Sequence, residues 1–160
     1  IIKMLEKNIN LSNCTIMKKN FLLLLLSMFT LVACADSKSM PITFEQLPNE
    51  AQTFIQKNFP SVQIDYILME DGWNTEYEVR LSNGTKVEFN EQGDMRQVDC
   101  EYGSVPESIL LNPIKSYLQT HFPNTNVTEY HVERKEIKVE LNTGIELVFN
   151  AQGGFLRIDD

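Results

Sequence analysis

The sequence has 160 residues, of which 22 are Asp or Glu and 14 are Lys or Arg, for a formal net charge of −8. This acidic balance, without a basic cluster, argues against nucleic acid as a partner, because binding to phosphates depends on Lys and Arg. The sequence also lacks a P-loop, a G-x-S-x-G elbow, an H-E-x-x-H motif and a paired C-x-x-C motif. It therefore predicts no catalytic residues, no metal site and no cofactor.

The N-terminal segment has the pattern of a secretory signal. Lys18 and Lys19 form a short basic region, and a nearly uninterrupted apolar run follows from Phe21 to Val32. The run is shorter than the roughly 20 residues that a permanent membrane helix needs. We therefore expect a signal peptide over 17–33, preceded by an upstream extension over 1–16 that is not part of the native protein.

The end of this signal resembles the lipobox of bacterial lipoproteins. Leu31-Val32-Ala33 precedes Cys34, and on this resemblance Cys34 would be acylated and become the mature N-terminus. The alternative is an ordinary cleaved signal with an incidental cysteine. If Cys34 is acylated, we expect the protein to lie in the periplasm or at the cell surface, attached to the outer membrane only through its N-terminal acyl chains.

Removing residues 1–33 changes the charge and the cysteine count. Four basic side chains and one acidic side chain leave with this segment, so ten basic and twenty-one acidic side chains remain, a net charge near −11. Cys100 is then the only thiol of the predicted domain, which excludes a disulfide within it. We expect Cys100 to be a small buried hydrophobe. The alternative, a nucleophile, would need a base such as His121 or His131, and neither lies in a recognisable motif.

The predicted domain begins after a short polar tether over 34–41. Thr43 and Gln46 have the spacing of a capping box, and Pro48 suits a first helical turn. An amphipathic helix that ends at Pro60 is indicated by apolar residues at helical spacing, namely Leu47, Ala51, Phe54, Ile55 and Phe59.

Alternating apolar residues and glycine turns then predict an antiparallel meander. Its strands are expected at Val62 to Leu68, Trp73 to Leu81, Thr85 to Phe89 and Met95 to Cys100. In the last of them the apolar positions shift phase, which predicts a β-bulge.

Residues 81–94 return with the same pattern as residues 141–154, so the chain is expected to be a duplicated unit. In the second copy the helical region has five more residues, and we expect a short turn followed by a main helix with a buried stripe formed by Ile114, Tyr117, Leu118 and Phe122. Its strands are expected at Val127 to Glu133, Glu136 to Leu141, Ile145 to Phe149 and Phe155 to Asp159.

The predicted fold class is α+β, a tandem repeat of one helix and a four-stranded antiparallel meander. The first repeat covers 42–101 and the second covers 102–160. A single four-stranded sheet with one helix buries little surface. We therefore expect the two halves to form one curved sheet with the helices on one face.

A resemblance to a known family rests on short runs that recur in the two copies: Leu47-Pro48, Phe59-Pro60, Tyr77-Glu78-Val79, Asn83-Gly84, Val87-Glu88-Phe89 and Gln92-Gly93. They resemble the PepSY-like, beta-lactamase-inhibitor-like periplasmic proteins of Bacteroidetes. The resemblance implies tandem helix-plus-four-strand repeats, an envelope location and no established activity. This chain departs from the family pattern in one respect. Such secreted inhibitors brace their loops with disulfides, whereas the predicted domain, with Cys100 as its only thiol, cannot form one.

Two surfaces are candidates for an interaction site. The first is the sheet face away from the helices, expected to bear Glu76, Glu78, Arg80, Lys86 and Glu88, with Lys138, Glu140 and Glu146 in the second copy. The alternative for this face is simple solvation. The second is the loop around Trp73, which would be an interface residue if exposed and part of the core otherwise.

Three functions remain. The first is a non-enzymatic envelope protein that binds or inhibits another protein partner. The second is a binder of a small ligand or cation, which would need a pocket with convergent polar groups. The third is a hydrolase, which would need clustered acids or Cys100 beside a histidine.

Overall fold

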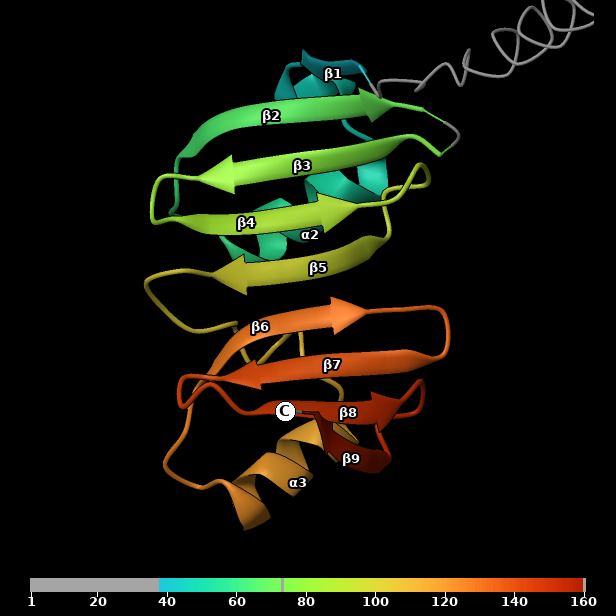
Figure 1. Cartoon of the computed structure of the whole chain (residues 1–160). Coiled ribbons are helices and arrows are strands. Elements are labelled where there is room, and N and C mark those ends of the chain that lie inside the picture. The colour runs from blue at the N-terminus through green and yellow to red at the C-terminus, as the bar shows by residue number, and fades with distance from the viewer. Residues whose placement is uncertain (1–37, 73, 160) are drawn as a thin grey trace, which may run out of the picture. The chain divides into compact units, whose positions relative to one another are not determined.

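The computed structural model describes residues 38–72 and 74–159. These residues form a mixed α/β fold with a single open sheet of nine antiparallel strands and two α-helices (Figure 1). The strands are β1 (Lys38–Pro41), β2 (Ile64–Asp71), β3 (Glu76–Leu81), β4 (Thr85–Phe89), β5 (Met95–Cys100), β6 (Val127–Val132), β7 (Glu136–Leu141), β8 (Glu146–Asn150) and β9 (Phe155–Asp159). The helices are the 3₁₀ helix η1 (Phe44–Gln46), α2 (Asn49–Asn58) and α3 (Asn112–His121). Each strand pairs with the next strand of the sequence.

Several sequence predictions concern residues outside this range. The signal peptide, the lipid site at Cys34 and the loop residue Trp73 lie outside the described residues, so they stay predictions. Among the helices of residues 38–72 and 74–159, none has the length and apolar character to cross a bilayer.

The prediction of a tether over 34–41 is wrong for its last four residues. Lys38–Pro41 form the edge strand β1, which pairs antiparallel with β2 from Lys38 opposite Asp71 to Pro41 opposite Leu68. The segment has no apolar periodicity because its side chains are mostly exposed. The backbone groups at the free edge of β2 pair with it regardless of side chains, and a proline is tolerated on an edge strand.

The other predicted elements are confirmed within a few residues. Thr43 and Gln46 do form the start of a helical turn, in which the Thr43 backbone N–H donates to Gln46 Oε1 at 2.8 Å. In the second copy the turn at 106–110 precedes α3, as expected from the longer helical region. The bulge expected in β5 is present, since Glu88 pairs with Gln97 and Phe89 pairs with Met95.

Two glycine turns have the same geometry in the two halves of the sheet. Gly93 and Gly153 have φ of +86° and +82°, in the region that favours glycine. In each turn the glycine N–H donates to the carbonyl three residues earlier, that of Asn90 or Asn150, at 2.9 Å. Each turn also lies against a helix start, because a Cβ on Gly93 would come within 2.7 Å of Pro48, and one on Gly153 within 3.2 Å of Pro113.

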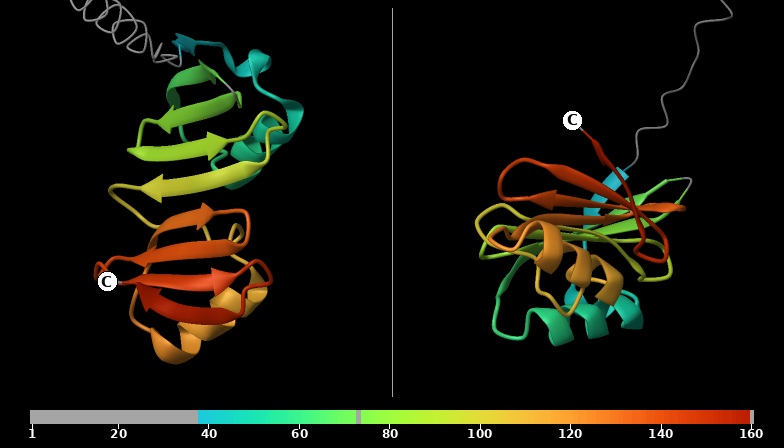
Figure 2. Two further views of the ribbon diagram at one scale, coloured as in Figure 1. Left: turned by 45° about the vertical axis from the view of Figure 1, so that its right-hand side comes forward. Right: turned by 90° about the horizontal axis from the view of Figure 1, so that it is seen from below.

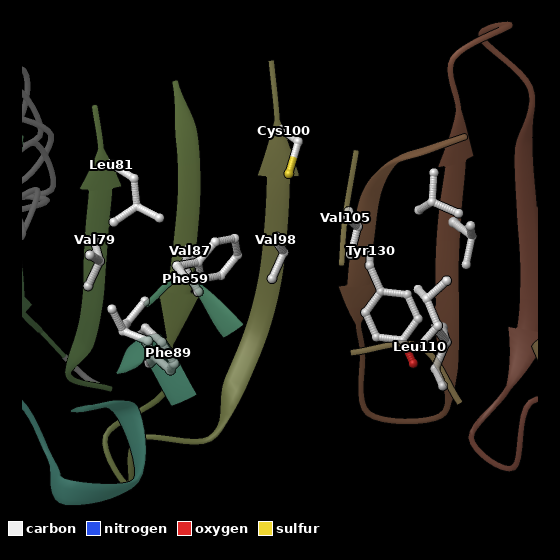
Figure 3. Packing of buried hydrophobic residues seen from close by; sticks show 14 of the residues in the cluster. Phe59, Val79, Leu81, Val87, Phe89, Val98, Cys100, Val105, Leu110 and Tyr130 are labelled. Atoms are coloured by element: carbon white, nitrogen blue, oxygen red, sulfur yellow. The ribbon is translucent and has the colours of Figure 1, made fainter. Parts of the chain in front are cut away.

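A single apolar cluster includes buried side chains of the sheet and of both helices. The described pairings align the core row Ile67, Val79, Val87, Val98, Tyr130, Val139 and Leu147, all buried. Figure 3 shows part of this row, with Val79, Val87 and Val98 on neighbouring strands. The buried residues of α2 and α3 belong to the same apolar cluster: Ala51, Ile55, Ile114 and Leu118.

Each helix also contacts the sheet through an aromatic pair. Phe54 of α2 meets Phe89 of β4 edge-on, with ring centroids 5.6 Å apart. Tyr117 of α3 meets Phe149 of β8 edge-on at 5.5 Å and stacks on Phe155 of β9 at 4.6 Å. Tyr117 therefore connects α3 to the last strand of the sheet.

Candidate functional site

The sheet face away from the core row carries mostly polar side chains from β2 to β9, although Leu68 and the fully buried Val148 also lie on it. Because successive side chains of a strand point to opposite faces, the residues on either side of the core row lie on this second face. The first of its two rows reads across the sheet as Tyr66, Arg80, Lys86, Asp99, Glu129, Glu140, Glu146 and Asp159. The second row reads Leu68, Glu78, Glu88, Gln97, His131, Lys138, Val148 and Arg157. We call these two rows the polar face.

Charge is distributed unevenly on the polar face. In the first row two cations, Arg80 and Lys86, are followed by five carboxylates on consecutive strands, from Asp99 on β5 to Asp159 on β9. In the second row the order is reversed, because two carboxylates come first and cations follow on β7 and β9. The polar face therefore carries opposite charges at the two ends of each row.

Ion pairs connect the two rows. Lys86 Nζ lies 2.8 Å from Glu88 Oε1, and Lys138 Nζ lies 3.4 Å from Glu146 Oε1. Hydrogen bonds with these carboxylates raise the pKa of both lysines. Arg157 donates to both Glu136 and Asp159, at 2.8–3.2 Å. These partly exposed pairs orient the side chains and contribute little stability each, roughly 0–1 kcal/mol.

The five carboxylates of the first row form the carboxylate row. The negative charge in the middle of this row is less well balanced by nearby cations. Glu129 lies between Asp99 and Glu140 in the register, and like charges directly opposite each other are destabilising. Partial burial raises the pKa of Glu129, and the charges of Asp99, Glu140 and Glu146 raise it further. One compensating contact is the hydrogen bond that Gln97 Nε2 donates to Glu129 Oε1 at 2.7 Å. This part of the polar face is therefore suited to a cationic neighbour.

Most of the predicted surface residues are brought together on this face. Glu78, Arg80, Lys86 and Glu88 lie side by side on β3 and β4, and Lys138, Glu140 and Glu146 lie on β7 and β8. Glu76 lies farther along, at the end of β3 opposite Glu70. Asp99 and Glu129, the two carboxylates at the junction of the halves, were not among the predicted residues. Their alternation with the buried Val98 and Tyr130 is the signal that would have found them.

Two shallow hollows lie on the polar face. One, of about 580 Å³, is bordered by Arg80 and by the exposed rings of Tyr66 and Tyr102. The other, of about 380 Å³, is bordered by Asp99, Glu129 and Glu140. A third hollow, of about 280 Å³, lies elsewhere, between α3 and the segments on either side of it.

The residues considered for catalysis do not meet. The Cys100 thiol is buried, is contacted by Thr85 Oγ1 at 3.6 Å and has its pKa raised mainly by that burial. His121 packs against Tyr117 on α3, whereas His131 lies on β6 between Gln97 and Lys138. Across residues 38–72 and 74–159, no group of three or more His, Cys, Asp or Glu side chains is placed to hold a metal ion.

Comparisons with known proteins match both the fold and the sequence. A periplasmic protein of the DUF2874 family from Bacteroides vulgatus, described as putative, is 34% identical, with a TM-score of 0.74 over 79% of this chain and 99% of its own. A "putative calcium-regulated periplasmic protein" from Bacteroides thetaiotaomicron is 34% identical, with a TM-score of 0.74 over 76% and 97%. A "putative periplasmic protein of unknown function" from Bacteroides vulgatus is 28% identical, with a TM-score of 0.73 over 77% and 100%. A comparison with curated proteins found no match.

The sequence model of one family matches this chain twice. The matches cover residues 33–83 and 74–157, and the family is described as "Putative beta-lactamase-inhibitor-like, PepSY-like". The resemblance inferred from the sequence is thereby confirmed. The chain belongs to the PepSY-like family, whose solved relatives are described as periplasmic proteins.

Proposed function

We propose that this protein is a non-enzymatic envelope protein that binds another protein through the polar face of its sheet. The observation that carries the proposal is the polar face from β2 to β9, with charges of opposite sign at the two ends of each row. Electrostatic complementarity of this kind selects a partner and fixes its orientation. The beta-lactamase-inhibitor-like description of the family supports the same function by analogy.

The partner that fits is a protein surface with Lys or Arg opposite the carboxylate row. Asp99, Glu129 and Glu140 lie on neighbouring strands, and their mutual repulsion is relieved when a cation lies over them. The exposed Tyr66 and Tyr102 beside Arg80 supply the residue types that dominate binding energy at interfaces. Trp73 remains a candidate for the same role.

The proposal includes two features of the fold, the tandem duplication and the placement of both helices on one face of the sheet. The chain is a tandem duplication, supported by the two family matches and by the identical turns at Gly93 and Gly153. Its helices cover one face and leave the other free for a partner, which is supported by Figure 2, where α2 and α3 lie on the same side of the strands in the view from below. The protein is held at the outer membrane through a lipid on Cys34, in keeping with the periplasmic relatives.

A site-specific photocrosslinker tests the binding surface directly. It is placed at Lys86 or Glu140 on the polar face and, as the matched control, at the exposed Gln56 of α2. We expect both polar-face positions to capture the same envelope protein, and Gln56 not to capture it. The double variant Glu140→Lys, Glu146→Lys should reduce the yield at Lys86 at least tenfold, because it reverses the charge that the partner meets.

Equal capture at Gln56, or an unchanged yield in the charge-reversed variant, contradicts the proposal. The variant's cooperative unfolding, followed by circular dichroism, checks that the loss comes from the surface and not from misfolding.

Cation binding is the second candidate, because one solved relative is described as calcium-regulated and carboxylates are the ligands that Ca²⁺ prefers. The absence of a metal-holding group among the described residues makes it the weaker candidate. Calorimetric titration with Ca²⁺ alone separates the two functions. Saturable binding that disappears in Glu129→Gln would favour the cation, and no heat beyond dilution would remove this candidate.

A further inference from the structure

The last strand of the sheet differs from the first in how its free edge is protected. Edge strands offer unpaired N–H and C=O groups, and proteins block them with prolines, free charges or short strands. β1 is short and contains Lys38 and Pro41. β9, by contrast, exposes three large apolar side chains within five residues: Phe155 at 38%, Leu156 at 48% and Ile158 at 50%. β9 has a β-bulge at Leu156, because Val148 pairs with Arg157 and Phe149 pairs with Phe155. From Arg157 to Asp159, however, β9 pairs regularly with β8, and this part of its edge has neither a bulge nor a proline.

The only charged residues described in β9 are Arg157 and Asp159, and they neutralise each other. The Arg157 Nε and Nη2 atoms donate to Asp159 at 2.8 and 3.1 Å, while Nη1 and Nη2 donate to Glu136 of β7 at 2.9 and 3.2 Å. The guanidinium therefore lies over the polar face, toward β7, and does not stand as a free charge at the strand edge. A second strand can approach this edge without displacing an isolated charge.

The order of residues in β9 is self-complementary. If two copies of β9 pair antiparallel about a two-fold axis at Ile158, Arg157 of each copy lies opposite Asp159 of the other, and the two Ile158 side chains meet. Opposite charges in cross-strand positions are stabilising. The register centred on Arg157 instead would place the two arginines opposite each other, which is unfavourable.

We propose that two copies of this chain associate through β9, antiparallel and in the register centred on Ile158. The pairing joins the two nine-stranded sheets edge to edge and covers the exposed Ile158. Arg157 of each copy, which donates to Asp159 of its own strand, then also faces Asp159 of the other copy. It is an isologous two-fold contact, the commonest arrangement in homodimers. The inference is independent of the function proposed above.

Cysteine crosslinking tests the register. The segment from Ser37 to Asp160 is a compact unit by itself, and solved relatives are matched by it over nearly their whole length, so it serves as the test protein. In the proposed register the two Ile158 Cα atoms lie about 4.5–5.5 Å apart, within disulfide range. The two Leu156 Cα atoms are separated by four strand positions, about 13 Å, which no disulfide spans.

Ile158→Cys and Leu156→Cys are therefore a matched pair, because the two side chains are almost equally exposed, at 50% and 48%. Under mild oxidation we expect at least tenfold more covalent dimer from Ile158→Cys. Equal yields from the two variants would indicate random collision and would overturn the proposal. Cys100 does not interfere, because it is buried.

Charge exchange tests the same contact without a disulfide. Arg157→Asp places two acids in β9 and Asp159→Arg places two arginines, so each variant alone should dimerise at least tenfold more weakly than the unmodified segment. The mixture of the two should recover the dimer, since every acid then faces an arginine. Sedimentation velocity over roughly 1 µM to 1 mM, the range of weak interfaces, measures each species. An unmodified segment that stays monomeric throughout, or single variants that dimerise as well as it does, would overturn the proposal.

Discussion

Gln97 Nε2 donates a hydrogen bond to Glu129 Oε1 at 2.7 Å, across the junction where β5 meets β6. These two strands pair through three residue pairs, fewer than the five between β7 and β8. The junction therefore depends on side-chain contacts more than the interior of either half does. It is also where the carboxylate row of the polar face begins.

The first prediction concerns the charge of Glu129. Burial and neighbouring carboxylates raise its pKa in the folded chain. Between the unfolded and the folded pKa the folded chain binds more protons, so the contribution of Glu129 to stability falls as pH rises through that window. Glu129→Gln should therefore gain stability relative to the unmodified chain as pH increases from 4 to 7, by about 0.2–1 kcal/mol.

Urea unfolding at several pH values measures this difference. Glu107→Gln, on an exposed turn, is the control and should show no comparable trend. A stability difference for Glu129→Gln that shrinks toward neutral pH would contradict the prediction.

The second prediction compares two glycines with almost the same backbone. Gly93 has φ +86° and Gly144 has φ +81°, but an added Cβ meets Pro48 at 2.7 Å only at Gly93, with open space around Gly144. Gly144→Ala should cost about 1–2 kcal/mol, the usual penalty of a left-handed residue. Gly93→Ala should cost about 1–3 kcal/mol more, because the turn is pushed away from the start of α2. Equal unfolding midpoints for the two variants would show that the turn does not pack tightly on the helix.

The third prediction concerns Tyr117, which contacts Phe149, Phe155 and His121. Tyr117→Ala should cost about 3–5 kcal/mol. It should also accelerate amide exchange in β9, because the stack with Phe155 holds that strand. Phe54→Ala, which loses the single ring contact with Phe89, should cost about 1 kcal/mol less.

Hydrogen exchange followed by mass spectrometry separates the local effect from the global one. Tyr117→Phe keeps the ring and should leave β9 protection unchanged. Unchanged protection of β9 in Tyr117→Ala would show that the stack is not what holds the strand.

The fourth prediction concerns the thiol of Cys100. Burial and a raised pKa both reduce the thiolate that alkylating reagents need. Native Cys100 should therefore react at least about 100-fold more slowly than the same residue in urea. Gln56→Cys, with its exposed second thiol on α2, supplies the internal control for reagent activity. Fast modification of native Cys100 would revive the nucleophile alternative.

Much of the fold could be predicted because its signals are local. The spacing of apolar residues predicts the buried helix stripes that include Ala51 and Ile114. The glycine turns could be predicted because Gly93 and Gly153 supply the positive φ that such turns need. β1 could not be predicted this way, since it is defined by backbone pairing with β2 and its own side chains are mostly exposed.

The polar face was predicted in part. Arg80, Lys86 and Glu88 alternate with buried residues on clearly patterned strands. Asp99 and Glu129 come together only through the pairing of β5 with β6, and no local pattern states which strands of the two halves meet. In the second half it is Pro113, in the first turn of α3, that packs on the glycine turn, as Pro48 does in the first half.

The strictly sequential order of the strands bears on how the chain acquires its structure. When each strand pairs with the one before it, most contacts join residues near in sequence, and chains of low contact order fold quickly. A polypeptide that emerges N-terminus first, from a ribosome or a translocation channel, finds a template for each new strand already in place. The sheet can then grow in the direction of emergence, and at every stage the short β1 edge and the newest strand are its two open edges.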